Sequence, residues 1–139
     1  MPSIDHLGIA VHSLDAARQF YRRLGLEVTG EEVVEQERVR VAMVPLGESR
    51  LELLEPTSED SPLARFLAKR GEGLHHVALR VTDLTGVVER LKATGTRLVT
   101  DRIQVGAGGH RYVFVHPSAA GGVLLELCEE PGPDRKSVV

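Results

Sequence analysis

The stretch Ile4–Val11, IDHLGIAV, returns in similar form as LHHVALRV at Leu74–Val81, 70 positions further along the chain. Both copies carry a histidine in third place, followed by the alternation of small and branched apolar residues that is typical of a half-buried strand. A polar residue suited to cap a helix follows each copy, then apolar residues at helical spacing, then a glycine suited to end the helix. The caps are Ser13 and Thr82/Asp83, and the glycines are Gly25 and Gly95. The repeat therefore predicts two similar modules.

Further strand-like stretches follow each predicted helix, so each module is predicted to be βαβββ. These stretches are RVRVAMVPL (38–46), SRLELLEP (49–56), RYVFVHP (111–117) and GVLLELCE (122–129). The fold class is α+β, with the two modules in tandem pairing into a curved mixed sheet. We expect a single domain over 1–139, with module one at about 3–56, a connecting helix at about 60–70, module two at about 73–130 and a frayed tail at 131–139.

Four polar residues fall on the strand face that the helices are not expected to cover. Strand alternation places His6 and His76 on that face beside small residues, whereas Glu52 and Glu126 each stand between two leucines and point away from them. A buried carboxylate is costly unless a partner or a cation neutralises it. If the modules pair, two imidazoles and two carboxylates converge and suit a divalent transition ion in an open cleft. The alternative is that these four are ordinary core or surface residues. The repeat argues against it, because the same pair of residue types occurs at matching positions in both modules.

Composition limits the possible partners. Charged residues make up 27% of the 139 residues and the net charge is −3, so we expect neither a nucleic-acid nor a membrane surface. No apolar run approaches the roughly 20 residues that cross a bilayer. Only 4% of residues are aromatic, which argues against stacking platforms for bases. Cys128 is the single cysteine and cannot form an internal disulfide, and we expect a cytoplasmic protein.

The segments DHLGIAV and HHVAL resemble the vicinal-oxygen-chelate superfamily, whose members pair two βαβββ modules around a metal. Within it, the chain is similar to the methylmalonyl-CoA epimerases from Ile4 to about Glu129. Two longer segments carry that likeness, LELLEPTSEDSPLARFLAKRGEGLHHVAL and VGAGGHRYVFVHPSAAGGVLLEL.

The resemblance implies a metal-dependent isomerase that interconverts the C2 epimers of an acyl-CoA, methylmalonyl-CoA, through a metal-stabilised enolate. It implies one divalent ion, cobalt above all, although nickel, manganese and zinc also suit nitrogen and oxygen ligands. It further implies a homodimer. The implied metal ligands are His6, Glu52, His76 and Glu126, and the second of these positions is glutamine in some epimerases.

Epimerisation needs an acid/base on each side of C2. Glu126 is the first catalytic candidate. A glutamate that some family members carry in the strand RVRVAMV is replaced here by Val41, so the second acid/base is either Glu52 or a bound water. Arg111, Lys69 and Arg70 are candidates for contacts with the coenzyme A phosphates, although ordinary surface charge explains them as well.

Two other functions remain open from the sequence. Glyoxalase I (lactoylglutathione lyase) uses the same ligand types in its bacterial forms, and only the connecting segment and the closing run favour the epimerase. A metal-free small-molecule binding protein of the same superfamily is the other alternative. Such proteins lack the ligand residues and line their cleft with aromatic residues, which are few here.

Overall fold

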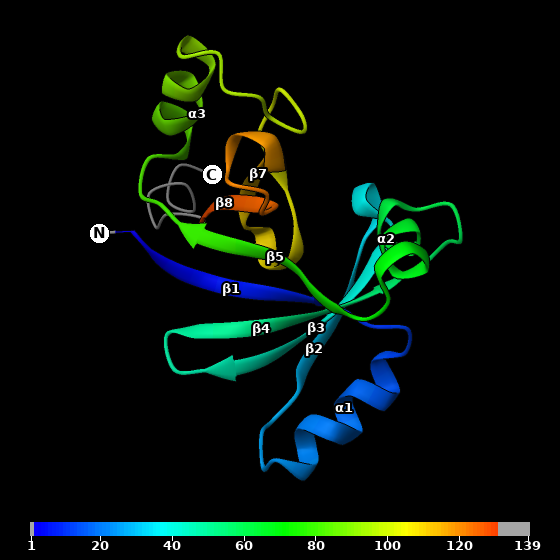
Figure 1. The fold of residues 1–139 in the computed structure, drawn as a ribbon. Coiled ribbons are helices and arrows are strands. Elements are labelled where there is room, and N and C mark those ends of the chain that lie inside the picture. The colour runs from blue at the N-terminus through cyan, green and yellow to red at the C-terminus, as the bar shows by residue number, and fades with distance from the viewer. Residues whose placement is uncertain (1, 131–139) are drawn as a thin grey trace. The chain divides into compact units, whose positions relative to one another are not determined.

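The computed structural model describes residues 2–130, and all structural statements concern these residues. The two predicted βαβββ modules are present, with a helix between them (Figure 1). The first module consists of β1 (Ser3–Ala10), α1 (Leu14–Arg23), β2 (Thr29–Val34), β3 (Val39–Leu46) and β4 (Ser49–Pro56). The connecting helix is α2 (Pro62–Arg70). The second module consists of β5 (Gly73–Arg80), α3 (Leu84–Ala93), β6 (Gln104–Val105), β7 (Arg111–Val115) and β8 (Leu125–Glu129). The α+β class is thus confirmed.

The predicted helix boundaries follow the expected capping chemistry. The Ser13 side chain accepts a hydrogen bond from the Ala16 amide, and Asp83 accepts one from Gly86. After each helix comes a glycine with positive φ, Gly25 at 84° and Gly95 at 74°, which is the backbone conformation expected just past a helix end. No membrane-spanning helix occurs among residues 2–130, because none is both long and apolar enough.

Some strand predictions were wrong in extent. The stretch predicted from 122 becomes β8 only at Leu125, because Gly121 and Gly122 both take positive φ in a turn. The stretch predicted to 117 ends as β7 at Val115, since His116 begins a short 3-10 turn at Pro117–Ala119. The sequence did not locate β2 or β6.

The chain divides into two compact units that cut across the modules. One unit comprises residues 6–76, and the other comprises residues up to 5 together with those from 77 onward. The boundary falls inside β1 and inside β5, so each of these strands contributes to both units. The single domain over 1–139 stays a prediction, and the tail at 131–139 lies outside the described residues.

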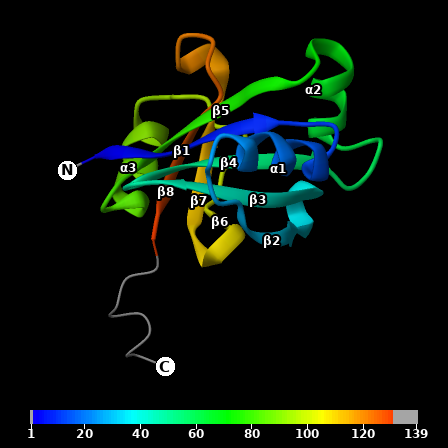
Figure 2. The same ribbon diagram turned by 90° about the horizontal axis from the view of Figure 1, so that it is seen from below.

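In the unit formed by residues 6–76, the strand order is β2-β3-β4-β1, followed by the first residues of β5. β1 pairs with β4 in parallel, and β3 pairs with both β2 and β4 in antiparallel fashion. Figure 2 views the sheet from the side on which α1 lies against β4. The core on that side contains Val11, Leu14, Ala42, Val44 and Leu53, which leaves the opposite face free of this helix.

The other unit repeats this arrangement with β5-β8-β7-β6 and α3. β5 and β8 pair in parallel, whereas β8 and β7 pair in antiparallel fashion. The helix-covered core contains Leu84, Val88, Val113, Val115 and Leu127. Ala78, Tyr112 and Cys128 are buried on the opposite face, and Phe114 packs against them.

A glutamate at the end of the last strand anchors the helix in each module. Glu55 accepts a hydrogen bond from the Leu14 amide at 2.7 Å and pairs with Arg40 at 3.1 Å.

In the second module Glu129 contacts the Leu84 amide at 3.4 Å and pairs with Arg111 at 2.6 Å. The repeated pattern LELLE at 51–55 and LELCE at 125–129 could have indicated this shared role of Glu55 and Glu129. The ion pair with Glu129 also shows that Arg111, a candidate for contacts with coenzyme A, is held by a carboxylate on the helix-covered side.

Candidate active site

Three of the four predicted metal ligands meet on the face opposite α1. Nε2 of His6 lies 3.1 Å from Nε2 of His76 and 3.6 Å from Oε2 of Glu52. Nε2 of His76 lies 4.0 Å from Oε1 of Glu52. Both histidines are buried and Glu52 is partly buried. The structure thus brings together side chains from β1, β4 and β5.

The spacing of these donor atoms suits one divalent cation. With metal–ligand bonds of about 2.0–2.2 Å, neighbouring ligand atoms around an ion lie roughly 3–3.5 Å apart, close to the distances within this group. Two imidazole nitrogens and a carboxylate oxygen are the ligands that zinc and similar transition ions accept. Three protein ligands also leave positions for further ligands. The residues present therefore fit a divalent metal.

Gly8 makes room for one of these ligands. A Cβ atom at this position would lie 2.2 Å from Cε1, 2.4 Å from Nδ1 and 2.7 Å from Nε2 of His76. The imidazole of His76 therefore lies directly over the backbone of β1. The sequence indicated small residues beside the histidines, but it did not show which ring fills the space.

Glu126 lies in the unit that contains residues from 77 onward. It is 8% exposed, and its register partners are Ala78 on β5 and Phe114 on β7. It therefore shares a face with these residues and points away from the core beneath α3, as strand alternation predicted.

Val41, the residue at the expected position of the second acid/base, lies on the same sheet face as Glu52. Met43, two positions further along β3, pairs with Glu52, and Val41 itself pairs with Leu54, so strand alternation puts Val41 on the face of Glu52. It is 2% exposed. An apolar side chain therefore occupies this place, and no carboxylate of β3 can move a proton there.

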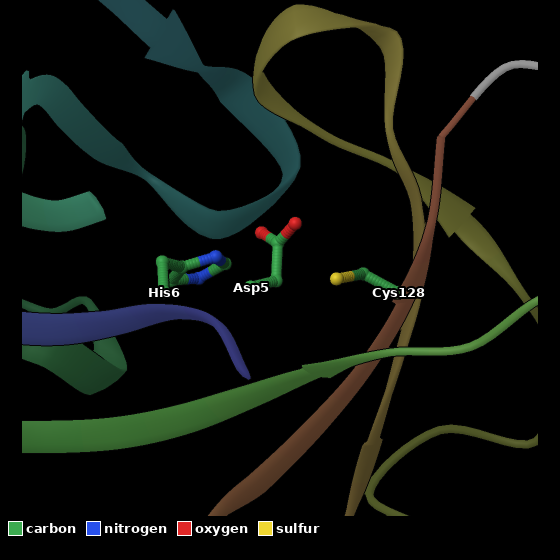
Figure 3. A group of neighbouring side chains, drawn as sticks. All are labelled: Asp5, His6 and Cys128. Atoms are coloured by element: carbon green, nitrogen blue, oxygen red, sulfur yellow. The ribbon is translucent and has the colours of Figure 1, made fainter. Parts of the chain in front are cut away.

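A second polar group surrounds Asp5, which is fully buried. Figure 3 shows the thiol of Cys128 directed toward Asp5, and His110 and Glu130 also offer ligand atoms near this carboxylate. However, Nε of Arg80 donates a hydrogen bond to Oδ1 of Asp5 at 2.8 Å. This bond raises the pKa of the Arg80 guanidinium against the opposing effect of burial. The guanidinium of Arg80 thus already neutralises the Asp5 carboxylate, and the residues around Asp5 are not suited to a second metal.

Replacing Arg80 with methionine is expected to lower the free energy of unfolding by about 3 kcal/mol, because a fully buried carboxylate loses its guanidinium. Urea denaturation followed by circular dichroism measures this loss. Asp5→Asn combined with Arg80→Met should recover part of it by removing the charge. Arg38→Met breaks the exposed pair with Asp60 and should change stability by less than about 1 kcal/mol. Equal losses for Arg38→Met and Arg80→Met would contradict the assignment.

Comparison with known proteins defines the class. A sequence model of the Glyoxalase/Bleomycin resistance protein/Dioxygenase superfamily matches residues 5–114, and the chain belongs to this superfamily. It is 41% identical to the uncharacterized protein YqjC of Bacillus subtilis, with 95% of each chain covered.

Two named relatives point to one activity within the superfamily. The chain is 40% identical to the mitochondrial methylmalonyl-CoA epimerase of Bos taurus, over 89% of this chain and 72% of that protein. Its fold matches a variant of the Streptomyces coelicolor methylmalonyl-CoA epimerase in complex with 2-nitronate-propionyl-CoA with a TM-score of 0.89 and 42% identity, covering 94% of this chain and 95% of that one.

Proposed function

We propose that the protein is a metal-dependent methylmalonyl-CoA epimerase, an isomerase that interconverts the C2 epimers of its acyl-CoA substrate. The observation that carries this proposal is the group of His6, Glu52 and His76, whose donor atoms lie 3.1–4.0 Å apart. The relatives of known name support the substrate class. We further propose cobalt as the ion, a homodimer as the assembly and the cytoplasm as the location.

We propose Glu126 as the fourth ligand. Glu126 pairs with Ala78, which follows His76 by two positions in β5. Strand alternation therefore directs the side chains of Glu126 and His76 to the same face of the sheet. A divalent cation held by these residues supplies a Lewis acid that stabilises the negative charge formed when a carbon between two carbonyl groups loses its proton.

The protein's carboxylates then have to move the proton. We assign Glu126 to one face of C2 and Glu52 to the other, because Val41 leaves β3 without a carboxylate on this side of the sheet.

The named relatives favour the epimerase over glyoxalase I. The ligand types do not discriminate between the two reactions, but relatives that match over 89% of the chain are named as methylmalonyl-CoA epimerases. The filled ligand positions also argue against a metal-free binding protein.

Exchange of the C2 hydrogen of methylmalonyl-CoA with solvent deuterium, followed by proton NMR, tests the proposal. We expect exchange and epimer interconversion that fall by at least about 100-fold after treatment with a chelator and return with cobalt. The hemithioacetal of methylglyoxal and glutathione should give no product. Exchange no faster than in buffer, or turnover of the hemithioacetal alone, would refute the epimerase assignment.

A further inference from the structure

His75 contacts the ring of the candidate ligand that follows it in β5. Nδ1 of His75 lies 2.9 Å from Nδ1 of His76, and the two ring centroids are 5.2 Å apart. Nε2 of His76 faces His6 at 3.1 Å. His76 therefore presents one nitrogen to the group of metal ligands and the other to His75.

Helix α2 restrains His75 from the other side. The ring of Phe66 meets that of His75 edge-on, with centroids 4.9 Å apart and an angle of 77° between the planes. Cζ of Arg70, one turn further along the helix, lies 5.7 Å from the centroid of Phe66. The position of the His75 ring is thus set by packing against a helix as well as by its own strand.

The direction of the hydrogen bond between the two histidines decides whether His76 can bind a metal. An imidazole nitrogen ligates a cation through its lone pair, so Nε2 of His76 must carry no proton, and the neutral ring then carries its proton on Nδ1. This N–H group can donate to His75 only if Nδ1 of His75 offers a lone pair. If Nδ1 of His75 donated instead, Nε2 of a neutral His76 would carry the proton and could not ligate.

We propose that His75 is a positioning residue for the metal centre: it accepts a hydrogen bond from Nδ1–H of His76 and thereby holds that ring in the tautomer and orientation that ligate through Nε2. The proposal rests on the metal centre of the proposed function. It requires no change in the number of protons on either ring. A hydrogen-bond acceptor behind a ligating histidine is a general requirement of such sites, because it fixes the ring and increases its basicity. Here an imidazole held against Phe66 fills that role.

Two variants separate the hydrogen bond from the shape of the residue. His75→Phe keeps an aromatic ring against Phe66 and removes the acceptor. His75→Asn removes the ring but places an amide oxygen where Nδ1 was. Titration of the metal-free proteins with Co²⁺, followed by calorimetry, should show a 10- to 100-fold weaker affinity for His75→Phe. The affinity of His75→Asn should stay within about threefold of the original value.

The titration uses the metal alone, so it does not depend on the substrate. If the variants bind Co²⁺ with the expected affinities but the protein does not epimerise methylmalonyl-CoA, the proposed function is refuted and the role of His75 is still supported. In the Zn²⁺-loaded protein, proton–nitrogen correlation NMR should show His76 protonated at Nδ1. Thermal melts of the metal-free variants verify that each is folded. Unchanged affinity in His75→Phe, an equal loss in both folded variants, or His76 protonated at Nε2 would overturn the proposal.

Discussion

Gly8→Ala is expected to weaken the binding of Co²⁺ by at least about 100-fold and to reduce epimerisation to a similar extent. The added Cβ would lie 2.2–2.7 Å from three ring atoms of His76, closer than carbon and nitrogen atoms can approach. Gly8 does not have a positive φ, so the backbone itself accepts alanine and the effect is purely steric. The ring of His76 must move away from β1, and Nε2 leaves its place beside His6 and Glu52. Titration of the metal-free variant with Co²⁺ measures the loss.

Gly47→Ala is the matched control for this substitution. Gly47 lies in the exposed turn between β3 and β4 with a φ of 65°, and an added Cβ atom would have no heavy atom other than those of its chain neighbours within 4 Å. Alanine there should lower the free energy of unfolding by about 1 kcal/mol through backbone strain and leave Co²⁺ affinity unchanged. If Gly8→Ala bound Co²⁺ as tightly as Gly47→Ala does, the placement of the His76 ring over β1 would be wrong.

Glu126→Gln is expected to lower epimer interconversion by about 10²–10⁴-fold, the usual contribution of a positioned acid or base. Glutamine keeps an oxygen that can ligate a metal but cannot take up a proton. We expect deuterium still to enter one epimer of methylmalonyl-CoA, the one whose C2 proton does not face residue 126. Exchange of each purified epimer in D₂O, followed by NMR, measures the two faces separately.

Glu52→Gln is the complementary variant, and glutamine is the residue that the family resemblance permits at this position. It should lose interconversion as well, but retain exchange of the opposite epimer. Loss of exchange from both epimers together with weakened Co²⁺ binding would show that the residues act only as ligands. Unchanged interconversion in Glu52→Gln would place the second acid/base outside the pair.

The sequence by itself determined the repeated modules, the helix ends and the sheet faces of the chemically important residues. These features depend on interactions between near neighbours: alternation along a strand directs His6 and Glu52, and the side chains of Ser13 and Asp83 bond to amides three residues away. The helix Pro62–Arg70 was predicted to within two residues for the same reason, since a proline begins it and Gly71 follows it.

Only the tertiary structure decided which of these residues meet. His6, Glu52 and His76 come from distant parts of the chain, and their approach depends on the pairing of β1 with β4 and on the place of β5 beside them. The repeat treated Gly8 and Ala78 as equivalent, yet only Gly8 has a histidine ring over its backbone. Likewise, strand alternation directs successive residues such as His75 and His76 to opposite faces, whereas their Nδ1 atoms lie 2.9 Å apart. Such contacts are set by strand order and side-chain packing, because residues far apart in sequence have no local pattern that records them.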